Sequence, residues 1–162
     1  PKPVIAAVDG SAVAGGGGIV LACDLVVAGR SARFDSRFLT IGIHPGGGHT
    51  WRLRNITDLQ TAKAMVLFEQ TMDGEQAARR GVAWDCVDDD ILLDQAVEYA
   101  ERAAGHPREL VAVTKQTLHD TAAVTESIPS VQLEIEPQVW SMRQPAFTEM
   151  VAELKARIAD KG

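Results

Sequence analysis

Short hydrophobic segments alternate with short polar segments over the first half of the chain. Residues 4–8 are apolar at every position, which predicts a strand covered on both faces inside a parallel sheet. The segments expected to form strands are residues 4–8, 24–28, 32–35 and 82–87. The segments expected to form helices between them are residues 16–23, 51–55, 58–68 and 73–80.

Apolar residues recur at helical spacing through the second half of the chain. The helices expected there are residues 88–104, 107–122, 128–143 and 146–159. Asp88 or Asp89 is expected to cap the first of these helices. A mixed region followed by helices predicts one α/β domain, with its core in residues 1–87 and a helical region in residues 88–162.

Composition narrows the class of protein. The 162 residues are 46% hydrophobic and 23% charged, as expected of one soluble globular domain. The net charge of −6 and the scattered basic residues argue against a nucleic-acid partner, and no apolar run is long enough for a membrane span. Cys23 and Cys86 lie in apolar segments and are expected to be buried, reduced thiols of a cytoplasmic protein.

Four consecutive glycines, Gly15 to Gly18, stand between the first strand and the first helix. Glycine is a poor helix former, so this run indicates close approach of another group to the backbone. Free N–H groups at the start of a helix suit an anion or a developing oxyanion. The alternative is a tight turn without a ligand, but four adjacent glycines exceed what a turn needs.

Several motifs together resemble those of one family. The matching segments are residues 2–10 (KPVIAAVDG), 15–16 (GG), 23–24 (CD), 32–34 (ARF), 45–48 (PGGG) and 77–83 (AARRGVA). In combination they are similar to the enoyl-CoA hydratase/isomerase (crotonase) superfamily.

The resemblance implies a spiral of ββα turns with a C-terminal helical trimerisation region. It implies an acyl-CoA substrate, a thioester enolate, and a homotrimer or dimer of trimers. Coenzyme A would belong to the substrate, with no separate cofactor. On the family's proportions the chain corresponds to the last two-thirds of such a protein, so the beginning of the domain is expected to be missing.

The resemblance also assigns candidate site residues. The backbone N–H of Gly15 is expected to be an oxyanion donor, with Gly16, Gly18, Phe38 and Gly46 binding substrate. Gly18 and Phe38 occupy the positions of the two hydratase glutamates. Because neither residue transfers a proton, standard hydration is not expected.

Other polar residues offer substitutes for the missing carboxylates. His44 is a candidate acid or base, or else a loop histidine that hydrogen-bonds a carbonyl. Asp35 is a base if its side chain points inward, and a solvated loop charge if it does not. His49 is expected to have a structural role, and no third ligand accompanies His44 and His49, so no metal site is predicted.

The two substitutions also change the expected shape of the site. Gly18 leaves space and Phe38 fills space with apolar surface, which predicts a bulkier, apolar acyl group. The sequence therefore indicates an acyl-CoA enzyme that performs enolate chemistry. The alternatives are a non-catalytic acyl-CoA-binding protein and an inactive truncated homologue.

Overall fold

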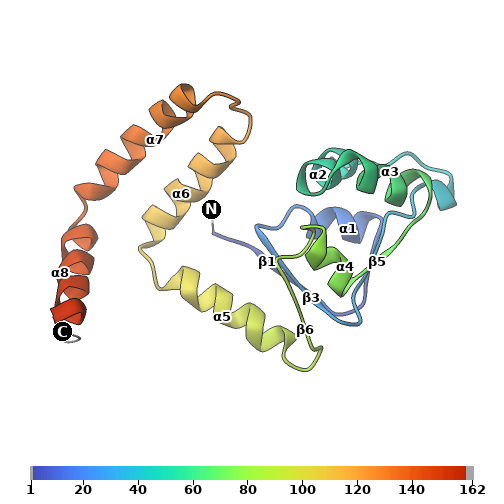
Figure 1. The fold of residues 1–162 in the computed structure, drawn as a ribbon, viewed down its shortest axis with the longest axis horizontal. Coiled ribbons are helices and arrows are strands. Elements are labelled where there is room, and N and C mark those ends of the chain that lie inside the picture. Colours follow the sequence, from blue (N-terminus) through green and yellow to red (C-terminus); the bar gives the residue numbers. More distant parts are fainter. Residues whose placement is uncertain (1, 160–162) are drawn as a thin grey trace. The chain divides into compact units, whose positions relative to one another are not determined.

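The computed structural model describes residues 2–159 and divides the chain into two compact units (Figure 1). The first, the α/β unit, comprises Val4–Glu101. The second, the helical unit, comprises Arg102 onward together with the residues before Val4. The sequence-based division at residues 87 and 88 stays a prediction.

The α/β unit contains six short strands in two three-stranded sheets. The strands are β1 (Ile5–Val8), β2 (Ser11–Val13), β3 (Leu25–Gly29), β4 (Arg33–Asp35), β5 (Met72–Asp73) and β6 (Asp85–Val87). One sheet has the order β1-β3-β6 and is parallel throughout. The other has the order β2-β4-β5, in which β2 pairs parallel and β5 antiparallel with β4.

The strands β1 and β2 lie in different sheets, as do β3 and β4, and this crossing makes the ββα repeat, whereas β5 stays in the sheet of β4. Between β1 and β2 the chain turns at Gly10, whose φ of 136° is a conformation that L side chains rarely adopt. The N–H of Arg33 donates to the carbonyl of Gly10 at 2.8 Å, which joins this turn to the next one. The α/β class and the ββα turns expected from the sequence are therefore present in this unit.

Helices follow the strand pairs (Figure 1). They are α1 (Gly15–Val20), the 3-10 turn η1 (Leu39–Ile41), α2 (His49–Ile56), α3 (Leu59–Leu67), α4 (Gly74–Arg79) and α5 (Leu92–Ala104), whose last turn passes into the helical unit. Asp58 caps α3, and Asp73 caps α4 in a reciprocal capping box with Gln76. The apolar core gathers between these elements and includes Val26, Phe34, Leu53, Met65, Met72 and Val82.

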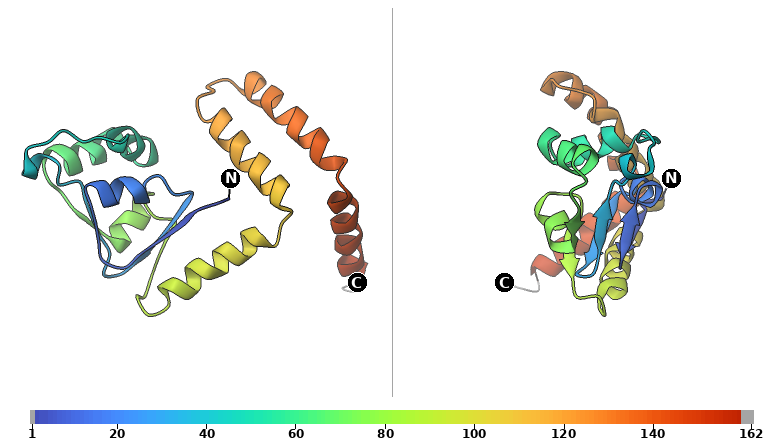
Figure 2. Two further views of the ribbon diagram at one scale, coloured as in Figure 1. Left: turned by 180° about the vertical axis from the view of Figure 1, so that it is seen from behind. Right: turned by 90° about the vertical axis from the view of Figure 1, so that its right-hand side faces the viewer.

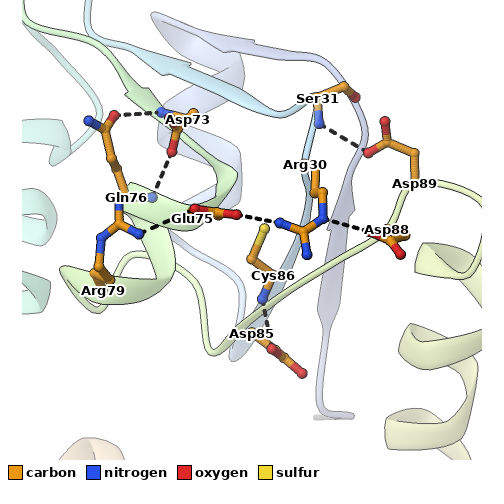
Figure 3. Close-up of polar contacts among 10 residues, drawn as sticks. All are labelled: Arg30, Ser31, Asp73, Glu75, Gln76, Arg79, Asp85, Cys86, Asp88 and Asp89. Atoms are coloured by element: carbon orange, nitrogen blue, oxygen red, sulfur yellow. Dashed lines mark hydrogen bonds and ion pairs between the residues drawn. The ribbon is translucent and has the colours of Figure 1, made fainter.

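A polar network joins the end of β3 to α4 and to the segment after β6 (Figure 3). Arg30 donates to Asp88 at 2.5 Å and also pairs with Glu75. The N–H of Ser31 donates to Asp89 at 3.1 Å. Asp88 and Asp89 thus hold the turn after β3, and the prediction that one of them caps the following helix is wrong.

Other differences from the sequence-based expectations come from tertiary contacts. The strands β2 and β5 were not predicted. Within the described residues β1 lies at a sheet edge with Ala7 exposed, so the expected cover on both faces is wrong. Cys23 and Cys86 are each half-buried, so the expectation that they are buried is wrong.

The helical unit contains α6 (Arg108–Thr121), α7 (Ser127–Met142) and α8 (Pro145–Ala159). The helices α6 and α7 run side by side in opposite directions, and α8 follows α7 (Figure 2). None of the described side chains in these three helices is buried. No helix within residues 2–159 has both the length and the apolar character that a membrane crossing requires.

Candidate active site

The glycine turn, defined as Ala14 to Gly17, leaves N–H groups without an acceptor at the start of α1. Gly15 and Gly16 are the first two residues of this helix, and both are exposed. Among the described residues, no acceptor receives a hydrogen bond from the N–H of Gly15 or Gly16. The first intrahelical bond runs from Gly18 to Ala14 at 3.0 Å. These two N–H groups are therefore available to an anion.

Ala14 precedes the helix in an unusual backbone conformation. Its φ is 46° and its ψ is −111°, which is rare for a residue with a Cβ. The N–H of Ala14 donates to the carbonyl of Asp35 at 3.0 Å, so the end of β4 holds the turn in place. Strain of this kind often occurs at functional sites, where the surrounding structure maintains it.

The loop of residues 37–48 carries the other predicted site residues. Phe38 is buried, whereas Gly46 and His44 are exposed. The N–H of Ile43 donates to the carbonyl of Phe38, and the N–H of His49 to that of Gly46, both at 3.1 Å. These bonds fold the loop back on itself before α2 begins.

His44 bonds to the backbone. Its Nδ1 lies 2.7 Å from the carbonyl oxygen of Pro45, which can only accept, so Nδ1 carries the proton. Nε2 is the ring nitrogen that this bond leaves unoccupied. Both interpretations of His44, the carbonyl-bonded loop residue and the acid or base, are compatible with this geometry, and its catalytic role stays a prediction.

Asp35 does point inward and is buried at the end of β4. Its carboxylate is not free, because Oδ2 lies 2.6 Å from the guanidinium of Arg37. This oxygen is therefore occupied by an ion pair within the protein. The positions of the two hydratase glutamates, Gly18 and Phe38, supply no carboxylate at all.

The sequence did not reveal the buried pair formed by Ser36 and His49. Oγ of Ser36 lies 2.7 Å from Nε2 of His49, and the two residues are 1% and 4% exposed. The ring of His49 meets that of Phe38 edge to face, with centroids 5.0 Å apart. Burial lowers the pKa of His49, which keeps the ring neutral near pH 7.

A small cavity lies beside this pair. It offers about 10 Å³ to the centre of a water molecule, and Gly17, Ser36 and His49 are among its lining residues. A larger, mostly apolar cavity of about 660 Å³ lies in the helical unit, where Trp140, Phe147 and Leu154 help to line it. No group of three or more possible metal ligands occurs within residues 2–159, so His44 and His49 have no such cluster around them.

Comparison with known proteins gives a consistent family match. The sequence model of the enoyl-CoA hydratase/isomerase family matches residues 1–150. "Probable enoyl-CoA hydratase EchA14" of Mycobacterium tuberculosis is 39% identical over 96% of the chain and 62% of its own length. The 1,2-epoxyphenylacetyl-CoA isomerase of Escherichia coli is 35% identical over 97% of the chain and 60% of its own length.

Solved structures agree with this match. An enoyl-CoA hydratase from Polaromonas superposes with a TM-score of 0.90 at 25% identity, over 97% of this chain and 61% of the other. An enoyl-CoA hydratase from Bacillus anthracis gives 0.88 at 26% identity, over 97% and 60%. The chain spans about three-fifths of the length of the relatives that it matches.

Proposed function

Because the chain belongs to the enoyl-CoA hydratase/isomerase family, we propose that it binds an acyl-CoA thioester and stabilises the thioester enolate. Two of its relatives are named for reactions of CoA esters, an isomerisation and a hydration. The single observation that carries the proposal is the pair of unbonded N–H groups of Gly15 and Gly16 at the start of α1.

The proposed chemistry follows from where charge develops. Removing the proton next to a thioester carbonyl moves negative charge onto its oxygen. The N–H of Gly15 is proposed as a donor to that oxygen, with Gly16 binding substrate, and one such donor is typically worth about 3–4 kcal/mol. The hydrogen bond from Ala14 to Asp35 holds the glycine turn, which keeps both N–H groups in position.

The proton transfer is proposed to differ from that of a two-glutamate hydratase. Gly18 and Phe38 replace both carboxylates, and Asp35 is engaged by Arg37. His44 is left as the candidate acid or base in the loop, acting through the nitrogen that Pro45 does not occupy. An isomerisation or a C–C bond cleavage needs no activated water and fits this set of residues better than hydration does.

Removal of one donor tests the proposal. Proline at the first helical position is well tolerated but lacks the N–H, so Gly15→Pro removes the oxyanion donor. We expect turnover of crotonyl-CoA and longer enoyl-CoAs to fall about 10²- to 10³-fold. Gly15→Ala keeps the N–H, and no atom lies within 4 Å of the added Cβ, so it should lose far less.

Two outcomes would contradict or redirect the proposal. Equal turnover in folded Gly15→Pro and in the unmodified protein would exclude the oxyanion role. Tight binding of the whole acyl-CoA panel without any turnover would favour a non-catalytic acyl-CoA-binding protein, a candidate supported by the missing carboxylates. The same panel tests the expected preference for bulky acyl groups, since tighter binding of acetyl-CoA would contradict it.

Self-association through the helical unit, as a homotrimer or dimer of trimers, is also proposed. The support is the row of exposed apolar side chains on α7 and α8, which includes Met142, Phe147 and Leu154. Phe147→Glu should shift sedimentation toward smaller species, whereas Thr148→Glu places the same charge on an exposed neighbour as a control. A cytoplasmic location is proposed as well, because a chain with two cysteines in apolar segments is typical of a reducing compartment.

A further inference from the structure

We propose that His49 is a positioning residue, held by Ser36, that fixes the loop of residues 37–48 against the glycine turn and so sets acyl-CoA binding. This inference rests on the proposed function, because it concerns the geometry of the same site. His49 belongs neither to the glycine turn nor to the two positions of the hydratase glutamates, so the inference adds a new residue to the site.

The hydrogen bond between Ser36 and His49 closes the loop at its two ends. Ser36 follows β4 directly, and His49 is the first residue of α2. The 2.7 Å contact between Oγ and Nε2 therefore joins the residue before the loop to the residue after it. Phe38, His44 and Gly46, all predicted site residues, lie on the segment that this bond closes.

The ring of His49 also reaches the two neighbouring parts of the site. Phe38 packs edge to face on it at 5.0 Å. Gly17, the third residue of α1, lines the same small cavity as His49, and a Cβ added there would come within 3.8 Å of Cε1 of His49. The imidazole thus contacts the loop and the end of β4, and it faces a cavity shared with the helix that presents the oxyanion donor.

The second ring nitrogen makes this arrangement sensitive to protonation. Nδ1 of His49 is buried and has no hydrogen-bond partner among the described residues. The adjoining cavity is close to the smallest space that holds one water molecule. A proton added to Nδ1 or Nε2 would leave a charged donor in this nearly dry space.

The surroundings offer little compensation for such a charge. Besides His49 itself, the side chains that line the cavity from the end of α1 and from α2, α3 and β5 are apolar, namely Leu21, which follows α1, and Leu53, Met65 and Met72. On β2, Ala12 has no charge to offer, and on β4 the lining carboxylate is that of Asp35, already neutralised by Arg37 at 2.6 Å. Consistent with this geometry, burial lowers the pKa of His49.

The test measures crotonyl-CoA affinity by calorimetry from pH 5 to pH 8 in the protein, in His49→Gln, in Ser36→Ala and in the control His106→Gln. His106 is exposed in the turn after α5. We expect affinity to fall about five- to tenfold as His49 is protonated, the lower end of typical coupling between sites. His106→Gln should retain this fall, and His49→Gln, which cannot be protonated, should lose it.

Ser36→Ala should weaken binding at pH 7, because the loop loses the hydrogen bond that joins its two ends. Ring NMR of His49 in the unmodified protein follows its protonation directly. An unchanged fall in affinity in His49→Gln, or pH-independent binding while His49 titrates, would overturn the inference.

Hydrogen exchange separates failure of this inference from failure of the proposed function. Protection factors of residues 37–48 should drop at least about fivefold when His49 is protonated, and equally in Ser36→Ala at pH 7. This measurement needs no ligand and, in the unmodified protein, no variant that must fold. Unchanged protection overturns the inference even where crotonyl-CoA binds, whereas a drop in protection without any binding sustains the loop role and contradicts the proposed function.

Discussion

The α/β unit and the helical unit differ in how far their apolar side chains are buried. In the α/β unit, Leu53 and Val27 are almost fully buried, and Leu53 belongs to a continuous apolar core. In α6, α7 and α8 none of the described side chains is buried, and Leu154 is 57% exposed. Since burial of apolar surface is the main stabilising term, only the first unit contains its own source of stability.

This difference separates two tasks of the chain. The glycine turn and the loop of residues 37–48 lie on the unit that packs by itself, which gives a catalytic constellation the rigid support that it needs. A helix with apolar residues around much of its circumference is typical of a surface buried in an assembly. On α7 the exposed apolar residues are Ile128, Val131, Leu133, Ile135, Val139 and Met142.

The largest expected contrast comes from shortening one leucine in each unit. Leu53→Ala removes a side chain that is 1% exposed and should lower the free energy of unfolding by about 2–5 kcal/mol. Leu154→Ala, on the exposed side of α8, should change it by no more than about 0.5 kcal/mol in dilute, unassociated protein. Urea unfolding measures both, and equal losses would contradict the comparison.

Enlarging a glycine tests the close packing of the α/β unit. A Cβ on Gly74 would collide with the backbone carbonyl of Gly29 and come within 2.9 Å of Sγ of Cys86. We expect Gly74→Ala to cost about 3 kcal/mol, the upper part of the range for overpacked cores. Gly46→Ala is the matched control, because its Cβ meets no atom within 4 Å, and thermal unfolding distinguishes the two. A stable Gly74→Ala would show that α4 does not pack closely on β3.

Loss of a helix cap should have a smaller effect in the same unit. Asp73 accepts from the N–H of Gln76 at 2.7 Å, and the Gln76 side chain accepts from the N–H of Asp73 at 3.0 Å. Asp73→Ala should therefore lower stability by about 1 kcal/mol. Lys63→Ala, an exposed change within α3, serves as the control in the same denaturation series. Equal stability of the two variants would mean that the capping box contributes nothing.

The sequence predicted the well-marked elements of both units. The helix expected at 58–68 forms at Leu59–Leu67, and the one expected at 128–143 forms at Ser127–Met142. Local signals fix such elements, in the first case the cap at Asp58. The strands β2 and β5 have three and two residues, and their pairing with β4 decides them, so no local pattern could reveal them.

In the candidate site, too, some residues could be predicted from the sequence and others could not. Composition alone singled out the glycine turn, because consecutive glycines are conspicuous in a sequence. The Ser36–His49 pair lies 13 residues apart and meets only because the loop between them folds back. The one available signal was a polar residue at each end of a glycine-rich loop. That signal says nothing about burial, and burial is what distinguishes His49 from His44.

The smallest expected effect is a pH dependence of stability confined to the α/β unit. Burial lowers the pKa of His49 in the folded state, while the unfolded chain keeps an ordinary value near 6.5. Below that pH the unfolded state binds more protons, so the free energy of unfolding should fall as pH drops from about 6.5 toward the folded pKa. Two other groups with shifted pKa values change stability outside this pH range. Hydrogen bonds from Thr61 lower the pKa of Asp58, which affects stability below about pH 4. Burial raises the pKa of Cys86, which affects stability above about pH 9. Urea unfolding between pH 5 and 7.5 should therefore show that the free energy of unfolding rises with pH. His49→Gln should reduce this dependence on pH, and His106→Gln should leave it in place. The same dependence in all three proteins would mean that the imidazole of His49 is protonated as readily in the folded chain as in the unfolded one.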